Sequence, residues 1–267
     1  MNLGNVTDKT NFIILTLDCC RWDTFNQANT KLLDTLCEFR MAYTHGTYTL
    51  PAHISIFAGI LPDVRDDIPY YNRFSKNLFR ISSRKIEKTS FVEFPNGTKN
   101  IVEGFRSRGY SAYGTGAMSW FRHPLLTSPF DDFYYSEIHF DSQADYLLSK
   151  VKKNSGPYFL FANIGETHEP YEFGGHIEES LNSRARMRDF NDAGFISDDF
   201  DKQVKCVEYL DTKIFDLIKS LQKYCNDLVV VICGDHGECF GEDGLYGHGF
   251  YHEKIMEVPL GIFRIYA

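Results

Sequence analysis

The sequence predicts an α/β fold in which short buried strands alternate with helices around a mostly parallel sheet. Three mainly apolar runs lie at residues 12–17 (FIILTL), 158–164 (YFLFANI) and 228–233 (LVVVIC), and runs of this kind are typical of parallel strands that are buried on both faces. Apolar residues recur every three or four positions over 204–221, which indicates an amphipathic helix that packs on the sheet.

The remaining regular elements continue this alternation. Pro51 begins a helix over 51–58, because proline is pre-organised for the first helical turn. Residues 101–108 (IVEGFRSR) indicate a further helix, and the apolar stretch 258–265 indicates a last strand.

Two stretches interrupt the pattern. Residues 63–90 are rich in Arg, Lys and Tyr, and residues 172–202 are polar. We expect insertions over the active face of a single domain that spans residues 1–267. Each insertion is either a functional loop or an ordinary solvent-exposed loop. The basic side chains of residues 63–90 either bind an anionic substrate or form a solvated surface.

The composition limits the partners of the chain. It has 28 basic and 36 acidic residues, a net charge of −8, which disfavours nucleic acid and anionic membranes. No apolar run reaches the roughly 18 residues that a membrane span needs, and no signal peptide is visible, so we expect a cytoplasmic protein. The seven cysteines form no CxxC pair, which favours reduced thiols.

The segment GDHGE at 234–238 follows directly on an apolar strand. Asp235 offers a carboxylate oxygen and His236 an imidazole nitrogen, both of which bind divalent metals, and the flanking glycines let the backbone turn. The alternative for such a pair is an ordinary surface loop.

Asp18 and Thr49 occupy comparable positions in two other segments. Asp18 ends the first apolar strand, at the sheet edge where open α/β folds place their ligands. Thr49 precedes Pro51 and so lies beside the positive end of a helix, where a tetrahedral anion is favoured. Its hydroxyl becomes a useful nucleophile when a divalent cation lowers its pKa. The alternative for Thr49 is a helix cap.

Together these segments resemble a known family. IILTLDCCRWDTF, TYTLPAHISIFAGILP, VEYLDTKIFDLIKSL and VVVICGDHGECFG…GHGFYHEKIMEVPL resemble, in this order, the signature blocks of the sulfatase and phosphonate monoester hydrolase branch of the alkaline phosphatase superfamily. The resemblance implies a three-layer α/β/α sandwich with a central mostly parallel sheet, lacking the usual C-terminal subdomain. It implies Asp18, Asp235 and His236 as metal ligands, and Thr49 as nucleophile and fourth ligand.

The departures from the family pattern indicate the chemistry. Sulfatases make formylglycine from Cys or Ser at the nucleophile position, and Thr49 cannot be converted in this way. The chain is similar instead to nucleotide pyrophosphatases, phosphonoacetate hydrolases and lipoteichoic-acid synthases. In these enzymes the nucleophile is a threonine and the reaction takes place at phosphorus. Cys19 replaces a frequent second aspartate ligand, so zinc, manganese and magnesium all remain open. His53 replaces an arginine and either binds substrate or is structural.

Two further histidines match positions that contact the ester in relatives. His168 in GETHEPY and His248 in YGHGFYHE are expected to bind substrate and to act as catalytic acids. We expect one metal ion, with a second site left open at Glu166, His168 and His248. Glu238 and His252 are weaker candidates.

These observations predict a metal-dependent hydrolase of phosphate or phosphonate esters that acts on a small anionic ester through a covalent threonine intermediate. The alternatives are a phosphoryl-group transferase, a phosphosugar mutase, a sulfate-ester hydrolase and a non-catalytic degenerate family member.

Overall fold

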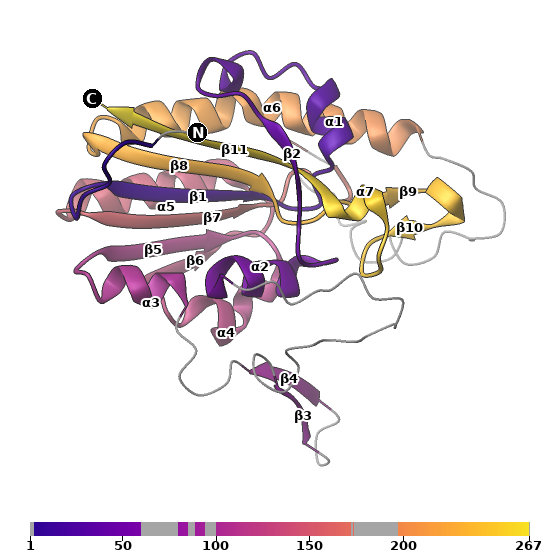
Figure 1. The fold of residues 1–267 in the computed structure, drawn as a ribbon, viewed down its shortest axis with the longest axis horizontal. Helices are drawn as coiled ribbons and strands as arrows, with labels where there is room; N and C mark the ends of the chain where they lie inside the picture. Colours follow the sequence, from indigo (N-terminus) through magenta and orange to yellow (C-terminus); the bar gives the residue numbers. More distant parts are fainter. Residues whose placement is uncertain are drawn as a thin grey trace.

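The computed structural model describes residues 3–59, 80–84, 89–93, 100–171, 173 and 197–266 (Figure 1). Most of the two predicted insertions, 63–90 and 172–202, lies outside the described residues. Among the helices that the structure describes, none is long and apolar enough to cross a membrane.

A seven-stranded sheet lies at the centre of the fold. Its strands are β1 (Asn11–Leu17), β2 (Arg40–Tyr43), β5 (Ser111–Gly116), β6 (Asp132–Tyr135), β7 (Tyr158–Ile164), β8 (Asp227–Gly234) and β11 (Glu257–Tyr266). They lie in the order β2-β11-β8-β1-β7-β5-β6. Neighbours from β8 to β6 pair in parallel, whereas β11 runs antiparallel to β8 and β2. Two antiparallel pairs stand outside this sheet: β3 (Arg80–Arg84) with β4 (Thr89–Glu93), and β9 (Cys239–Phe240) with β10 (Tyr246–Gly247).

Helices cover both faces of the sheet (Figure 1). The α-helices are α1 (Trp22–Gln27), α2 (Thr49–Ala58), α3 (Ile101–Arg106), α4 (Pro124–Thr127), α5 (Phe140–Lys153), α6 (Ser197–Leu221) and α7 (Glu253–Met256), and the short 3-10 turns are η1 (Leu33–Thr35), η2 (Ser119–Arg122) and η4 (Glu242–Gly244). One apolar core joins the sheet to α1, α5 and α6, and a second joins it to α2, α3 and α4. The fold is therefore the predicted α/β/α sandwich.

The pleat of β1 directs its residues alternately to the two cores. Ile13 and Leu15 belong to the core under α5 and α6, whereas Ile14 packs in the core under α2. Thr16 lies on the same face as Ile14, because side chains two residues apart share a face of a strand. By the same alternation Asp18 emerges on the side of α2, and this places its carboxylate near the start of that helix.

The predicted elements are present, with small shifts of their ends. The strand predicted at 158–164 has these bounds in the structure, whereas the helix predicted at 51–58 begins at Thr49 and the helix predicted at 204–221 begins at Ser197. Helix α5 was missed, although Phe140, Leu147 and Val151 lie buried on one face of it.

We expect Leu15→Ala to lower the free energy of unfolding by about 2 to 5 kcal/mol, since Leu15 is fully buried in the central strand and its removal leaves a cavity. Chemical denaturation measures this loss. Val6→Ala, at a side chain that is 48% exposed, is the control and should change stability by less than about 0.5 kcal/mol. Equal effects of the two substitutions would contradict the assignment of β1 to the core.

Candidate metal centre

The four predicted metal ligands converge at the carboxyl ends of β1 and β8. Thr49 Oγ1 lies 3.4 Å from Asp18 Oδ2 and 3.5 Å from His236 Nε2. His236 Nε2 lies 3.6 Å from Asp235 Oδ2 and 3.9 Å from Asp18 Oδ1. All four residues are buried, and Thr49 is the most exposed of them at 3%.

Parallel strand register brings the two carboxylates together. Leu17 of β1 is paired with Gly234 of β8, so the next residue of each strand, Asp18 and Asp235, leaves the sheet at the same edge. The backbone N–H of Asp235 still donates to the carbonyl of Leu17 at 3.3 Å, which keeps the two strand ends in register.

The donor atoms that face one another have the properties of a cation site. Asp18 Oδ1 and Asp235 Oδ2 are buried acceptors without a hydrogen-bond partner, and buried carboxylate oxygens are rarely left in this state. His236 Nδ1 lies 2.9 Å from the carbonyl oxygen of Gly237, which can only accept, so Nδ1 carries the hydrogen and Nε2 offers a lone pair. One ligand atom each of Asp18, Asp235 and His236 lie within 4.8 Å of one another, and this donor set fits a divalent metal.

Gly237 lets the GDHGE segment pass close to the segment before β11. A Cβ atom at Gly237 would lie 2.1 Å from the carbonyl oxygen of Lys254, and the Gly237 N–H donates to the carbonyl of Ile255 at 2.7 Å. Only glycine permits this contact, so the second glycine of GDHGE is required by packing.

Thr49 is the first residue of α2, and the N-cap is Tyr48, which makes no side-chain cap hydrogen bond. The alternative interpretation of Thr49 as the helix cap is therefore wrong. The hydroxyl is free to face Asp18 and His236 instead. It lies at an uncapped helix N-terminus, where backbone N–H groups and the helix dipole favour an anion.

The electrostatics of the two acids differ because their neighbours differ. Burial raises the pKa of Asp235 well above its usual range, and the nearby charge of Asp18 raises it further. Burial alone would also raise the pKa of Asp18, but the nearby imidazole of His168 and a hydrogen bond from Asn163 are among the causes that lower it below its usual value. Burial lowers the pKa of His236 to about 4, so its ring is neutral and able to coordinate.

Both ring nitrogens of His53 are bonded within the protein. Nδ1 lies 2.7 Å from the carbonyl oxygen of Thr49 and Nε2 lies 2.9 Å from the hydroxyl of Thr16. The ring is fully buried and packs edge-on against Phe121, and burial lowers its pKa to about 4. A substrate contact by His53 would break one of these bonds, so the structure favours the structural alternative, in which His53 supports the first turn of α2.

Asn163 is a residue of the site that sequence reasoning missed. Its Nδ2 donates to Asp18 Oδ2 at 2.9 Å, so Oδ2 is oriented while Oδ1 is left to face Asp235 and His236. The available signal was a polar side chain within the otherwise apolar strand YFLFANI.

His168 and His248, which the sequence predicts to bind substrate, lie beside the four candidate ligands. Their ring centroids are 5.7 Å apart, and the ring of His248 lies 4.7 Å from that of His236. Glu166, which the sequence left open for a second site, belongs to none of the groups of potential ligands among the described residues: its Oε1 accepts from the backbone N–H of Phe140 at 2.7 Å, and its buried Oε2 has no hydrogen-bond partner. His252 caps α7 instead, accepting from the N–H of Lys254 at 3.1 Å.

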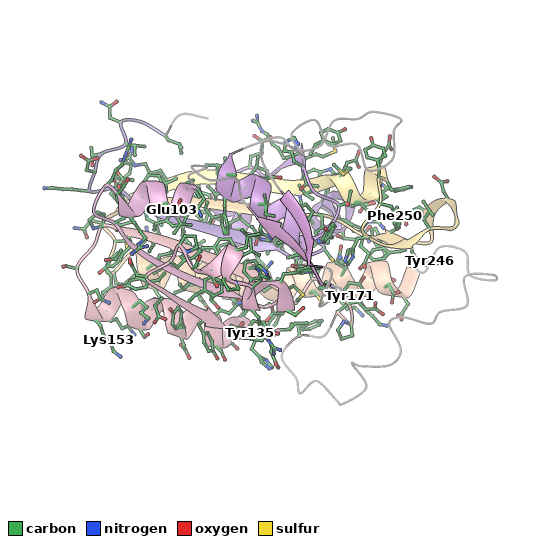
Figure 2. All side chains as sticks on the ribbon, turned by 90° about the horizontal axis from the view of Figure 1, so that it is seen from below. Glu103, Tyr135, Lys153, Tyr171, Tyr246 and Phe250 are labelled. Carbon is green, nitrogen blue, oxygen red and sulfur yellow. The ribbon has the colours of Figure 1, made fainter. Side chains whose placement is uncertain are left out.

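Glu238 has a larger role than the sequence indicated. Its carboxylate is 5% exposed, with Oε1 at 3.1 Å from His248 Nδ1 and Oε2 accepting from the hydroxyl of Tyr171. Burial alone would lower the pKa of His248, but the hydrogen bond and charge of Glu238 raise it. Figure 2 shows Tyr171 on the side of the molecule that carries Tyr246, away from the end with Lys153.

Arg21 holds the loop that follows the candidate ligands Asp235 and His236. It is 1% exposed, and its guanidinium bonds to Asp23 at 2.7 Å, to Glu242 at 2.6 Å and to the carbonyl of Glu238 at 3.2 Å. Its guanidinium carbon also lies 4.4 Å from the ring centroid of Phe240. These contacts fix the Glu238–Glu242 segment against the end of β1.

Comparison with known proteins gives one family match. A family model described as Sulfatase matches residues 10–263. No curated protein sequence matches the chain.

Several solved structures share the fold. The C-terminal periplasmic domain of phosphoethanolamine transferase EptC from Campylobacter jejuni is 12% identical with a TM-score of 0.65, over 96% of this chain and 79% of that one. The corresponding domain of EcEptC from Escherichia coli, in complex with Zn, is 14% identical with a TM-score of 0.62, over 97% and 73%. The putative sulfatase yidJ from Bacteroides fragilis is 16% identical with a TM-score of 0.62, over 98% and 70%. The first two are periplasmic domains, so they give no support to the expected cytoplasmic location.

We expect the metal-free protein to be stabilised by Asp235→Asn. The asparagine keeps an oxygen for the N–H groups of Cys19 and His236 and removes one of two facing buried charges. The melting temperature after chelation should rise by roughly 2 to 4 °C for each kcal/mol of relieved repulsion. Added zinc or manganese should then raise the melting temperature of the wild type and not that of the variant.

Asp8→Asn, at an exposed acid before the start of β1 and so at the opposite end of this strand from the site, is the matched control and should behave as the wild type. An equal metal-induced rise in Asp235→Asn and the wild type would show that Asp235 is not a ligand.

Proposed function

This chain belongs to the Sulfatase family, and from that premise we propose that it is a metal-dependent hydrolase of phosphate or phosphonate esters that acts through a covalent Thr49 intermediate. The observation that carries the proposal is the position of the Thr49 hydroxyl. It lies at an uncapped helix N-terminus and within 3.5 Å of two metal-ligand candidates, Asp18 and His236.

The proposed metal is held by Asp18, Thr49, Asp235 and His236. When bound, a divalent cation lowers the pKa of the threonine hydroxyl and offsets the negative charge that builds up on the ester. The orphaned oxygens of Asp18 and Asp235 support this assignment, as does the zinc complex of the similar EcEptC domain. Zinc, manganese and magnesium all suit a set of oxygen donors with one imidazole.

In the proposed reaction the Thr49 hydroxyl loses its proton to solvent, its oxygen attacks phosphorus, and the bond from phosphorus to the leaving oxygen breaks. The first-turn N–H groups of α2 stabilise the non-bridging oxygens. His248, oriented by Glu238, or His168 donates a proton to the leaving oxygen. Water then attacks the phosphothreonine and gives a proton to the histidine, the bond from phosphorus to the Thr49 oxygen breaks, and Thr49 regains its proton from solvent.

The identity of the nucleophile favours phosphate or phosphonate esters over sulfate esters as substrates. Hydrolysis of sulfate esters in this family uses an aldehyde hydrate made from Cys or Ser, and the methyl-bearing side chain of Thr49 cannot form it. The burial and convergence of all four ligand candidates also argue against a degenerate, non-catalytic member.

Transfer to an alcohol is the second candidate function. It would use the same phosphothreonine and replace water by an acceptor hydroxyl. A specific observation favours it, because the similar EptC from Campylobacter jejuni is a phosphoethanolamine transferase.

We expect Thr49→Ala to reduce turnover by roughly 1,000-fold or more while metal binding is weakened and remains measurable. The assay is a panel of nitrophenyl phosphate, phosphodiester, phosphonate and sulfate esters, together with mass spectrometry of rapidly quenched protein. In the wild type a phosphorus adduct should be found on the peptide that contains Thr49.

Thr127→Ala, in the short helix α4, is the matched control and should retain full activity. Undiminished turnover by Thr49→Ala would exclude the covalent route. Sulfate-ester cleavage by the wild type without activity on phosphorus would overturn the substrate class.

Product analysis with glycerol as an acceptor should separate the two candidate functions. For a hydrolase we expect the free acid to equal the released nitrophenol at every glycerol concentration, because water is the acceptor. A glycerol ester that replaces the free acid as glycerol is increased would instead establish the transferase.

A further inference from the structure

A pocket of about 390 Å³ lies apart from the candidate metal centre, between α1 and the segment 28–39 that leads through η1 to β2. Both α1 and this segment pack on the face of the sheet that α6 covers (Figure 1). None of the described residues that line the pocket is a candidate metal ligand. Its volume falls within the range of small-molecule sites in proteins.

Three aromatic side chains form part of the pocket wall: Trp22, Phe25 and Phe39. Trp22 and Phe25 are three residues apart on α1, so they lie on one face of this helix. The ring centroid of Phe39 lies 4.7 Å from that of Phe25, with the two rings tilted by 45°. Phe25 belongs to the larger apolar core and the other two rings pack against it, so the core holds the aromatic wall in place.

Hydrogen bonds to α6 hold the segment that forms the rest of the wall. The carboxylate of Asp211 in α6 accepts from the backbone N–H groups of Leu32 and Leu33 at 3.1 and 2.8 Å. The hydroxyl of Thr30 donates to Asp34 Oδ1 at 3.1 Å, and this orients a carboxylate of the pocket lining. The pocket is therefore formed in advance by the chain itself, and a ligand does not have to order its walls.

The charged part of the lining is negative. Asp34 and Glu38 line the pocket, whereas no lysine, arginine or histidine is among the described residues that do so. Glu38 pairs with Arg40 at 2.9 Å, but the two side chains are 76% and 70% exposed, so water screens this pair. Within the described part of the chain Asp34 Oδ2 has no hydrogen bond or ion pair. Burial and the charge of Asp34 raise the pKa of Cys37, which also lines the pocket, to about 11.

We propose that this pocket binds a small organic ammonium ion. The faces of aromatic rings attract such cations, and the attraction is stronger where water is excluded. A carboxylate beside the rings adds an opposite charge. An anion would be repelled by Asp34 and Glu38, and a neutral apolar molecule would remove water from Asp34 without compensating its charge. The claim concerns binding and is independent of the reaction that the chain catalyses.

Choline and its uncharged isostere 3,3-dimethylbutan-1-ol test the proposal on the full chain. The two molecules differ in the quaternary atom, which is a charged nitrogen in choline and a carbon in the alcohol. The chain has two tryptophans, so Trp120→Phe leaves Trp22 as the fluorescent reporter in the pocket wall. At constant ionic strength choline should change the emission of Trp22 in a saturable way, with a dissociation constant lower than that of the alcohol by about tenfold or more.

Two substitutions in this Trp120→Phe background separate the charge from the rings. Asp34→Asn should weaken choline binding by roughly tenfold, because it removes the charge and keeps an oxygen for the hydroxyl of Thr30. Phe39→Leu should weaken it by roughly threefold or more, since an aromatic face is lost while the wall stays apolar. Asp145→Asn, at an exposed acid of α5 that does not line the pocket, is the matched control and should keep the full affinity.

Equal binding of choline and its isostere would overturn the proposal, because the pocket would then be an apolar cavity only. Unchanged choline affinity in a folded Asp34→Asn variant would overturn it as well, and so would a Trp22 emission that does not saturate as choline is added.

Discussion

Two buried carboxylates at the ends of neighbouring parallel strands are the constraint on which the rest of the structure depends. Asp18 and Asp235 leave β1 and β8 at one edge of the sheet, and each keeps an oxygen without a hydrogen-bond partner. Two such charges cannot be brought together in a buried site without compensation. The surrounding histidines, Asn163 of β7 and the proposed cation all help to compensate the charge of the two carboxylates.

The side chains that support the site form two groups, one structural and one that orients a histidine beside the site. Below the site, His53 joins Thr16 of β1 to the first turn of α2, so that the nucleophile candidate Thr49 is positioned from the apolar core. Beside the site, Glu238 joins Tyr171 to His248. Both ring nitrogens of His53 are bonded within the protein, so its role is structural. The imidazole of His248, in contrast, lies at the edge of the candidate metal centre.

The fold and the positions of the four candidate ligands could be predicted from the sequence because local patterns encode them. An apolar run that stops at an acid, as at Asp18, and a proline-started helix after Thr49 each fix a local geometry, and the sheet then brings them together. Asn163 and Glu238 could not be assigned in this way, since their roles depend on contacts between segments that are far apart in the chain. The left-handed backbone of Cys19 has no local signal either, because cysteine does not favour it. The roles of the four ligands and of His168 and His248 remain proposals.

The order of the strands has a consequence for biosynthesis. β1 is made first, yet its two hydrogen-bonded neighbours are β7 and β8, which follow more than a hundred residues later. Asp18 and Thr49 are therefore synthesised long before Asp235 and His236. Until β7 and β8 have been made, the apolar strand β1 has no strand to pair with. The proposed cation could be captured only after His236 has emerged, so its binding would follow the synthesis of β8 and mark chains in which the central strands are complete.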